Sequence, residues 1–177
     1  LALHLHGSGK AAINTGVAFL DHMLTLFAFH GNFDLDITAT GDLEVEDHHT
    51  VEDVGIVLGQ ALEEALAKNK GFVRYGSFLL PMDEVLARVI LDASGRAFLH
   101  FHAEFKREML GTLATENVEE FFRALVRESK MTLHIDILTP GNDHHQVEAI
   151  FKGFGRALRQ AVVLDPDIEV ASTKGVL

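Results

Sequence analysis

The feature that most constrains how this chain can fold is an internal repeat. The motif His48-His49-x-Val51-Glu52 recurs as His144-His145-x-Val147-Glu148, at an offset of 96 residues (144 − 48). Matches at this offset continue with Gly59 and Gly155, Ala61-Leu62 and Ala157-Leu158, and Ala65 and Ala161. Shorter matches upstream pair residues 5–9 with 91–95 and residues 33–37 with 131–135. We therefore expect a duplication, with repeat halves at about 1–76 and 77–177 inside a single domain, 1–177.

Hydrophobic spacing predicts the same order of elements in each half: strand, Ser-Gly turn, strand, helix, strand and helix. The predicted helices cover residues 18–30, 50–67, 118–128 and 146–163, and the predicted strands include 35–40, 84–91, 97–105 and 131–137. Gly71, Gly76 and Pro81 are interpreted as breakers between the halves. This order predicts an α+β fold, in which the helices pack between two largely antiparallel sheets.

Composition limits the partners and compartments that we expect. The 177 residues, 47% of them hydrophobic, are enough for a well-filled core without disulfides. No run of about 18 or more apolar residues occurs, and the start at Leu1 shows no signal-peptide pattern, so we expect a cytoplasmic protein without a membrane partner. The formal net charge of −11 disfavours nucleic acid as a partner, although a few basic residues can still converge on a small anion.

The repeated motif carries the ligand types of a transition-metal site. Cysteine is absent, so imidazole and carboxylate are the good ligands available, a mixture that suits Mn, Fe, Co, Ni or Zn. On a helix, Glu52 shares a face with His48 (i, i+4) and with His49 (i, i+3). Adjacent His48 and His49 point about 100° apart, which favours the binding of two metals, one by each histidine, over the chelation of one metal by both. A polar helix face is the alternative for one such pair, but two copies in corresponding places favour metal.

The repeat also points to two ligand candidates outside the motif. His22 lies 26 residues before His48 (48 − 22). Glu120 lies 24 residues before His144 (144 − 120), so both candidates enter from the equivalent helix of their half.

Other polar residues are assigned from their position or their chemistry. Asp47 and Asp143 stand directly before the two motif helices, and we interpret them first as N-caps. The second interpretation is that they hold the metal-binding side chains in their orientation. Histidines without a repeat partner of ligand type are expected to be solvated or packed, namely His30, His100, His102 and His134. The groups that suit the oxygens of an anion such as phosphate are Arg74, Arg96, Lys152 and the segment Ser172-Thr173-Lys174-Gly175.

These motifs also resemble a known family, imidazoleglycerol-phosphate dehydratase of histidine biosynthesis, over essentially the whole chain. The segments that carry the resemblance are Thr15-Gly16-Val17-Ala18-Phe19-Leu20-Asp21-His22-Met23-Leu24, Glu46-Asp47-His48-His49-Thr50-Val51-Glu52-Asp53, Leu58-Gly59-Gln60-Ala61-Leu62, Pro81-Met82-Asp83-Glu84, Ser94-Gly95-Arg96, Asn142-Asp143-His144-His145 and Ser172-Thr173-Lys174-Gly175. The resemblance implies two manganese ions held by His22, His48, His49, Glu52, His144, His145 and Glu148. Glu120, the candidate ligand from the repeat, stands where many relatives carry histidine.

The resemblance further implies a substrate site, a reaction and an assembly. The residues implied to grip the substrate, chiefly its phosphate, are Arg74, Arg96, Lys152, Ser172 and Lys174. The family begins with an Arg-x-Thr-x-Glu-Thr segment whose glutamate moves protons; this places the acid–base glutamate before Leu1, so no catalytic residue is assigned within the chain. The implied reaction is loss of water from imidazoleglycerol phosphate to give imidazoleacetol phosphate. The implied assembly is a homo-oligomer, a shell of 24 subunits built from trimers, with metal ligands from more than one subunit.

Two other functions stay open on the residues. A dimetal phosphoester hydrolase also combines paired His and Glu ligands with nearby Arg and Lys, and it would release inorganic phosphate from the same substrate. A catalytically impaired, metal-stabilised oligomer is the second alternative. In that case metal would restore the assembly but would support no turnover.

Overall fold

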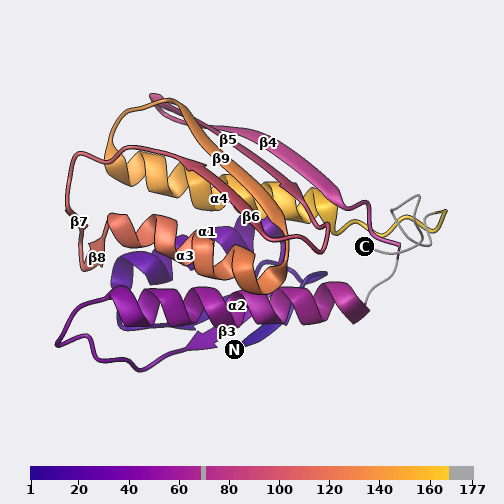
Figure 1. Ribbon diagram of the computed structural model, residues 1–177, viewed down its shortest axis with the longest axis horizontal. Coiled ribbons are helices and arrows are strands. Elements are labelled where there is room, and N and C mark those ends of the chain that lie inside the picture. Colours follow the sequence, from indigo (N-terminus) through magenta and orange to yellow (C-terminus); the bar gives the residue numbers. More distant parts are fainter. Residues whose placement is uncertain (69–70, 168–177) are drawn as a thin grey trace.

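The computed structural model of the protein describes residues 1–68 and 71–167. Two sheets enclose a layer of helices (Figure 1). The first sheet has the strand order β1 (Ala2–His4), β3 (Asp34–Thr38) and β2 (Ala11–Asn14). The second sheet has the order β4 (Tyr75–Met82), β5 (Val85–Asp92), β9 (Thr132–Thr139) and β6 (Phe98–His102), and a small hairpin pairs β7 (Met109–Leu110) with β8 (Leu113–Ala114). The helices are α1 (Ala18–Gly31), α2 (His48–Lys68), α3 (Glu116–Ser129) and α4 (Asp143–Ala161).

The α+β class with helices between two sheets is confirmed, and each sheet also contains one parallel pair of strands. In the first sheet β1 pairs with β3 in antiparallel fashion, whereas β2 and β3 are parallel. In the second sheet the β4–β5 and β5–β9 pairs are antiparallel, whereas β6 and β9 are parallel. Each parallel pair has a helix between its strands along the chain, α1 in one case and α3 in the other. Such a crossover is what a parallel connection requires.

The helices pack in pairs that combine one helix from each predicted half. Helix α1 packs against α4, which covers β4 and β5, and α2 packs against α3, which covers β6. Glycines permit both close contacts, because a Cβ at Gly155 would lie 2.6 Å from the Phe27 carbonyl oxygen, and one at Gly59 would lie 2.6 Å from that of Leu125. Buried Phe154 on α4 lies between the pairs, with its ring 5.1 Å from that of Phe27 on α1 and 5.5 Å from that of Phe122 on α3.

Strand β4 corrects the interpretation of Gly76 and Pro81 as breakers, since both lie inside it. Proline is tolerated there because β4 is an edge strand, where a missing N–H breaks no ladder on the open side. Glycine is needed because a Cβ at position 76 would collide with the backbone of Ala157 on α4. The two motif helices begin earlier than predicted, at His48 and Asp143 rather than at residues 50 and 146. Both His-His pairs therefore lie in the first turn of a helix.

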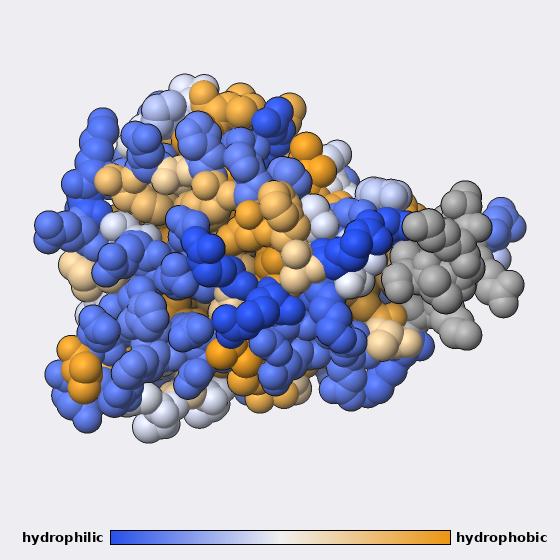
Figure 2. All heavy atoms as spheres, in the orientation of Figure 1, coloured by the Kyte–Doolittle hydropathy of each residue, from blue (hydrophilic) through white to orange (hydrophobic). Residues whose placement is uncertain are grey.

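The surface is mixed in character. Figure 2 shows a mainly hydrophilic face on which hydrophobic residues gather in the upper half, over the second sheet. On that sheet Tyr75, Leu79, Ile90 and Phe98 are exposed, whereas Val89 and Leu91 are buried against the helices. Among the described helices, none combines the length and apolar character needed to cross a membrane.

Candidate metal centre

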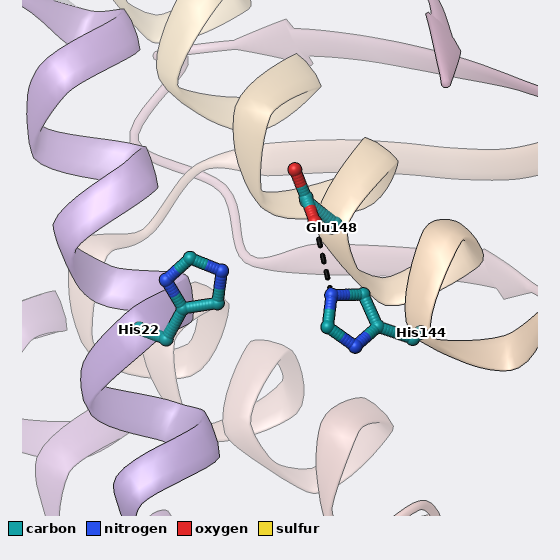
Figure 3. Close-up of side chains that lie close together, drawn as sticks. All are labelled: His22, His144 and Glu148. Atoms are coloured by element: carbon teal, nitrogen blue, oxygen red, sulfur yellow. Dashed lines mark hydrogen bonds and ion pairs between the residues drawn. The ribbon is translucent and has the colours of Figure 1, made fainter. Parts of the chain in front are cut away.

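Helices α1 and α4 bring together His22, His144 and Glu148 (Figure 3). One ligand atom of each residue lies within 4.8 Å of the others. His144 and Glu148 are one turn apart on α4, with 3.1 Å between His144 Nε2 and Glu148 Oε2, and His22 faces them from α1. Two imidazoles and a carboxylate make a mixed nitrogen and oxygen set, which suits a divalent transition metal.

Lys152 keeps the Glu148 carboxylate charged. The Glu148 side chain is only 9% exposed, and it contacts the Lys152 ammonium one turn further along α4. Burial alone would raise the pKa of Glu148, but the hydrogen bonds from Lys152 and His144 outweigh burial, so the pKa lies below its usual value. The carboxylate is therefore available as a charged ligand at neutral pH.

The second histidine of this pair points elsewhere. His145 Nδ1 lies 2.9 Å from Glu84 Oε2, and Asp83, Glu84 and His145 form a second group with ligand atoms within 4.8 Å. The pKa of Glu84 is lowered to about 2, first by the hydrogen bond from the Asn142 backbone N–H and then by that from His145. Adjacent His144 and His145 thus face different partners, as the 100° step of a helix implies.

The first copy of the motif has a looser arrangement on α2. His48 Nε2 lies 3.9 Å from Glu52 Oε2, and its Nδ1 lies 2.9 Å from Asn117 Oδ1 on α3. Glu120 lines the same pocket as His48 and pairs with Arg123 at 3.3 Å. Across residues 1–68 and 71–167, the groups on α4 are the ones that bring three such ligand atoms within 4.8 Å, and His48, Glu52 and Glu120 do not form a third.

His49 repeats the arrangement of His145. Its Nδ1 lies 2.9 Å from Asp42 Oδ2, in the segment before α2. The pKa of His49 is raised, first by the hydrogen bond to Asp42 and then by the charge of that carboxylate. Sequence reasoning missed both carboxylate partners, Asp42 and Glu84, because they lie 7 and 61 residues from their histidines and no spacing rule connects them.

Asp143 does not serve as the predicted cap of α4, whereas Asp47 directly precedes α2, as predicted, and its side chain binds another segment. The side chain of Asn142 caps α4 by accepting a hydrogen bond from the His144 backbone N–H. Asp143 lies inside the helix and accepts from the backbone N–H groups of Lys106 and Arg107, at 2.9 and 2.8 Å. Asp47 accepts from that of Ala114 at 2.9 Å. Both aspartates instead tie the segment around β7 and β8 to the start of a motif helix.

The predicted anion-binding residues are divided between two places. Arg74 is nearly buried and forms two hydrogen bonds to Asp92, of 2.6 Å from Nε and 2.9 Å from Nη2. Arg96 is exposed and lies 3.8 Å from the same carboxylate. Lys152 lies instead beside Glu148. Ser172 and Lys174 lie outside the described residues.

Helix α4 separates the arginines from the ligand group. The backbone N–H of Arg74 donates to the carbonyl of Ala161, at the C-terminal end of α4. Glu148 lies 13 residues earlier, and at 1.5 Å per residue this amounts to about 20 Å. Within one chain, Arg74 and Arg96 are therefore not brought to His22, His144 and Glu148.

The remaining histidines, those without a repeat partner of ligand type, are not members of either group. His100, His102 and His134 lie on β6 and β9, and His100 Nε2 is 3.1 Å from Asp136 Oδ1. His30, on α1, has a lowered pKa, first because of burial and then because of the nearby charges of Lys152 and Arg156.

Comparison with known proteins assigns the family. The family model described as imidazoleglycerol-phosphate dehydratase matches residues 15–158. The chain is 58% identical over 178 residues to the imidazoleglycerol-phosphate dehydratase of Acetivibrio thermocellus, covering 100% of the chain and 91% of that protein. It is 54% identical over 177 residues to that of Staphylococcus carnosus, covering 100% and 92%.

Solved structures agree with this assignment. The crystal structure of the imidazoleglycerol-phosphate dehydratase of Staphylococcus aureus subsp. aureus N315 is similar with a TM-score of 0.86, 52% identity and coverage of 92% of both chains. That of Pyrococcus furiosus, in complex with (S)-C348, has a TM-score of 0.82 and 40% identity, covering 99% of this chain and 94% of that chain. The chain belongs to the imidazoleglycerol-phosphate dehydratase family.

Proposed function

We propose that this chain removes water from imidazoleglycerol phosphate to give imidazoleacetol phosphate in histidine biosynthesis, and that manganese bound by the repeated motifs supports the reaction. Membership of the family supplies the reaction class, that of a hydro-lyase. The observation that carries the site assignment is the approach of His22, His144 and Glu148 to within 4.8 Å of one another.

The donor set fits a divalent ion such as manganese, because it combines imidazole nitrogens with a carboxylate that stays charged. We propose two ions per subunit. We propose that His22, His144 and Glu148 bind one ion, and that Glu120, His48 and Glu52 bind the other as its repeat counterpart. His49 and His145 point away from both groups of their own chain, so we propose that each binds an ion held by another subunit. When bound, such an ion supplies positive charge that acidifies an imidazole N–H or a hydroxyl and stabilises the anion left by loss of the proton.

We propose that Lys152 binds the phosphate of the substrate near the first group. It follows Glu148 by one helical turn, about 6 Å along the axis, so a phosphate at its ammonium keeps a small substrate within reach of the ligands. Its contact with Glu148 also holds the carboxylate in place. Lys152 therefore orients both the substrate and a ligand.

The distance of Arg74 and Arg96 from this group supports a site shared between subunits. We propose that another copy of the chain brings both arginines to the substrate, within the expected homo-oligomer of 24 subunits built from trimers. Arg74, held by Asp92, is fixed in place, whereas exposed Arg96 is available to an anion. Ser172 and Lys174 complete the proposed set of phosphate contacts.

The test is to strip the protein of metal and to measure both dehydration and phosphate release as manganese is added back. We expect dehydration to be lost on chelation and restored by manganese, with about two ions per subunit. His144→Ala should lower metal content and turnover together, and exposed His6→Ala is the matched control. Turnover that survives chelation would refute the proposal, and release of inorganic phosphate would support the hydrolase instead.

A further inference from the structure

We infer that Asp42 and Glu84 are positioning residues for the metal site, each fixing the orientation and the tautomer of one motif histidine so that its Nε2 can bind the ion. This inference rests on the proposed function. It assigns a role to two carboxylates outside the repeated motif, one in the segment before α2 and one at the turn between β4 and β5.

The two carboxylates make the same bond in both halves. Asp42 Oδ2 lies 2.9 Å from His49 Nδ1, and Glu84 Oε2 lies 2.9 Å from His145 Nδ1. An ionised carboxylate can only accept a hydrogen bond, so the proton belongs on Nδ1 in both rings. In a neutral imidazole with its proton on Nδ1, the lone pair is on Nε2. Both histidines are thus prepared to bind a metal through the same atom.

The repeat itself does not carry these carboxylates. Position 42 lies between repeat segments matched at offsets of 98 (131 − 33) and 96 (144 − 48), so its equivalents in the second half are Pro140 and Leu138, and neither contributes a carboxylate. Glu84 approaches from a different part of the fold, 61 residues before His145, whereas Asp42 lies only 7 residues before His49. Two unrelated segments therefore place the same chemical group on the same atom of equivalent histidines. Such a coincidence is expected if the bond serves the function of the histidine.

Each carboxylate is itself held in place. Glu84 Oε1 accepts a 2.6 Å hydrogen bond from the backbone N–H of Asn142, so the carboxylate bridges the start of α4 and the imidazole. A Cβ at Gly141 would collide with this carboxylate. Beside Asp42, a Cβ at Gly41 would collide with the hydroxyl of Thr50 on α2. Glycine at position 41 thus lets the segment that carries Asp42 lie close to α2, and glycine at position 141 leaves room for the Glu84 carboxylate.

Both carboxylate–histidine pairs, Asp42–His49 and Glu84–His145, are accessible to water, so their role in metal binding can be tested separately from protein stability. The side chains of Asp42 and Glu84 are 42% and 47% exposed, and ion pairs with such access to water contribute little to folding stability. Their removal should therefore leave the protein folded. An effect on metal binding can then be separated from an effect on stability.

The experiment measures manganese binding by the full chain, stripped of metal, in Asp42→Asn, Glu84→Gln and Glu84→Ala. An amide in place of the carboxylate loses the charge, and its NH₂ group can turn toward Nδ1 and shift the ring proton to Nε2, where it blocks the metal. We expect manganese to bind about 10–100-fold more weakly in each variant, the usual effect of losing such a partner. Exposed Glu44→Gln, in the same segment as Asp42, is the matched control and should bind as the natural chain does.

Nitrogen-15 spectra of histidine in the metal-free protein give a second readout. We expect Nδ1 of His49 and His145 to be protonated in the natural chain, and the signal of the affected ring to change in its own variant alone. If the natural chain binds two ions and the variants bind them equally well, this inference is wrong while the proposed function stands. If the natural chain binds no manganese, both fail.

Discussion

Gly155 sets the distance between the two helices that carry the His22, His144 and Glu148 group. A Cβ at position 155 would lie 2.6 Å from the Phe27 carbonyl oxygen, whereas ordinary contact begins at 3.4 Å. In Gly155→Ala, α1 and α4 must therefore move apart locally by about 0.8 Å (3.4 − 2.6). The contact lies 5 residues from His22 on α1 (27 − 22), and 7 and 11 residues from Glu148 and His144 on α4 (155 − 148 and 155 − 144), which is about one and a half to three turns, so the ligands should move as well.

The expected magnitudes differ for stability and for metal binding. Alanine in place of glycine in a helix interior stabilises by about 1 kcal/mol. Forcing an extra carbon into a packed contact costs about 1–3 kcal/mol, so the net loss should be between about 0 and 2 kcal/mol. Metal–ligand distances, in contrast, are held within about 0.2 Å. A shift of about 0.8 Å exceeds this tolerance, and we expect manganese to bind at least about tenfold more weakly.

The assay is titration of the metal-free protein with manganese, together with denaturant unfolding at a fixed subunit concentration. Gly153→Ala is the matched control, since its Cβ would meet the side chain of Val89 on the second sheet rather than α1. Gly59→Ala provides the repeat counterpart, because its Cβ would meet the Leu125 carbonyl and separate α2 from α3. Natural affinity in Gly155→Ala, or equal weakening in Gly153→Ala, would refute the link between helix spacing and the metal site.

Three further outcomes test the packing and the charges of the fold. Lys152→Met leaves the buried Glu148 carboxylate without its ammonium, so denaturant unfolding of the metal-free chain should show a loss of about 2 kcal/mol that manganese reduces. Phe154→Ala removes a fully buried ring between the helix pairs and should cost about 3–5 kcal/mol in the same assay, and a loss below 1 kcal/mol would contradict the packing described. Hydrogen bonds from the backbone N–H groups of Ser8 and Lys10 lower the pKa of Asp34 in the folded protein. The ionised Asp34 carboxylate therefore stabilises the fold at pH values above its pKa in the unfolded chain, and this stabilisation is lost as pH falls through its pKa in the folded protein. Asp34→Asn should therefore destabilise at pH 7 and lose its effect in strong acid when unfolding is followed across pH, and an effect that grows toward acid would contradict this sign.

The helices were predictable because their signals are local. The apolar spacing from residue 18 to 30 gave α1 to within one residue of its observed end at Gly31. The step of about 100° between neighbouring helical residues predicted that adjacent motif histidines point apart, and His144 and His145 do contact different partners. That the two histidines bind two different metals stays a prediction. The starts of α2 and α4 were less accurate, because the polar first turn of a helix carries no hydrophobic period.

Features that depend on distant parts of the fold were missed. Strand β4 contains Gly76 and Pro81, which locally indicate a break, and only its place at the edge of the sheet and against α4 makes both acceptable. The carboxylate partners of His49 and His145 come from loops that the sequence does not place. Asp143 was read as a cap because it precedes the apolar period, but Asn142 takes that position and leaves Asp143 to bind the backbone of another segment.

Each helix pair combines one helix from each repeat half, and this explains why one repeated motif gives two candidate metal groups whose ligand atoms approach one another to different extents. The first group takes His22 from the first half and both His144 and Glu148 from the second. Its counterpart takes His48 and Glu52 from the first half and Glu120 from the second. Neither of these two groups can form from one half alone, so we propose that the two halves make one domain.

The two groups also differ in the ligand that comes from the helix without the motif. Where α1 supplies His22, α3 supplies Glu120, whose carboxylate is drawn toward Arg123 rather than toward His48. Arg127 also lies 3.6 Å from Glu52, just as Lys152 contacts Glu148, so the motif glutamate of each group has one cationic partner. The looser group has a further cation to displace, Arg123 at Glu120, whereas the equivalent ligand of the other group is an imidazole, His22. We therefore expect the group on α1 and α4 to fill first when manganese is added, and Glu120→His to narrow the difference between the two affinities.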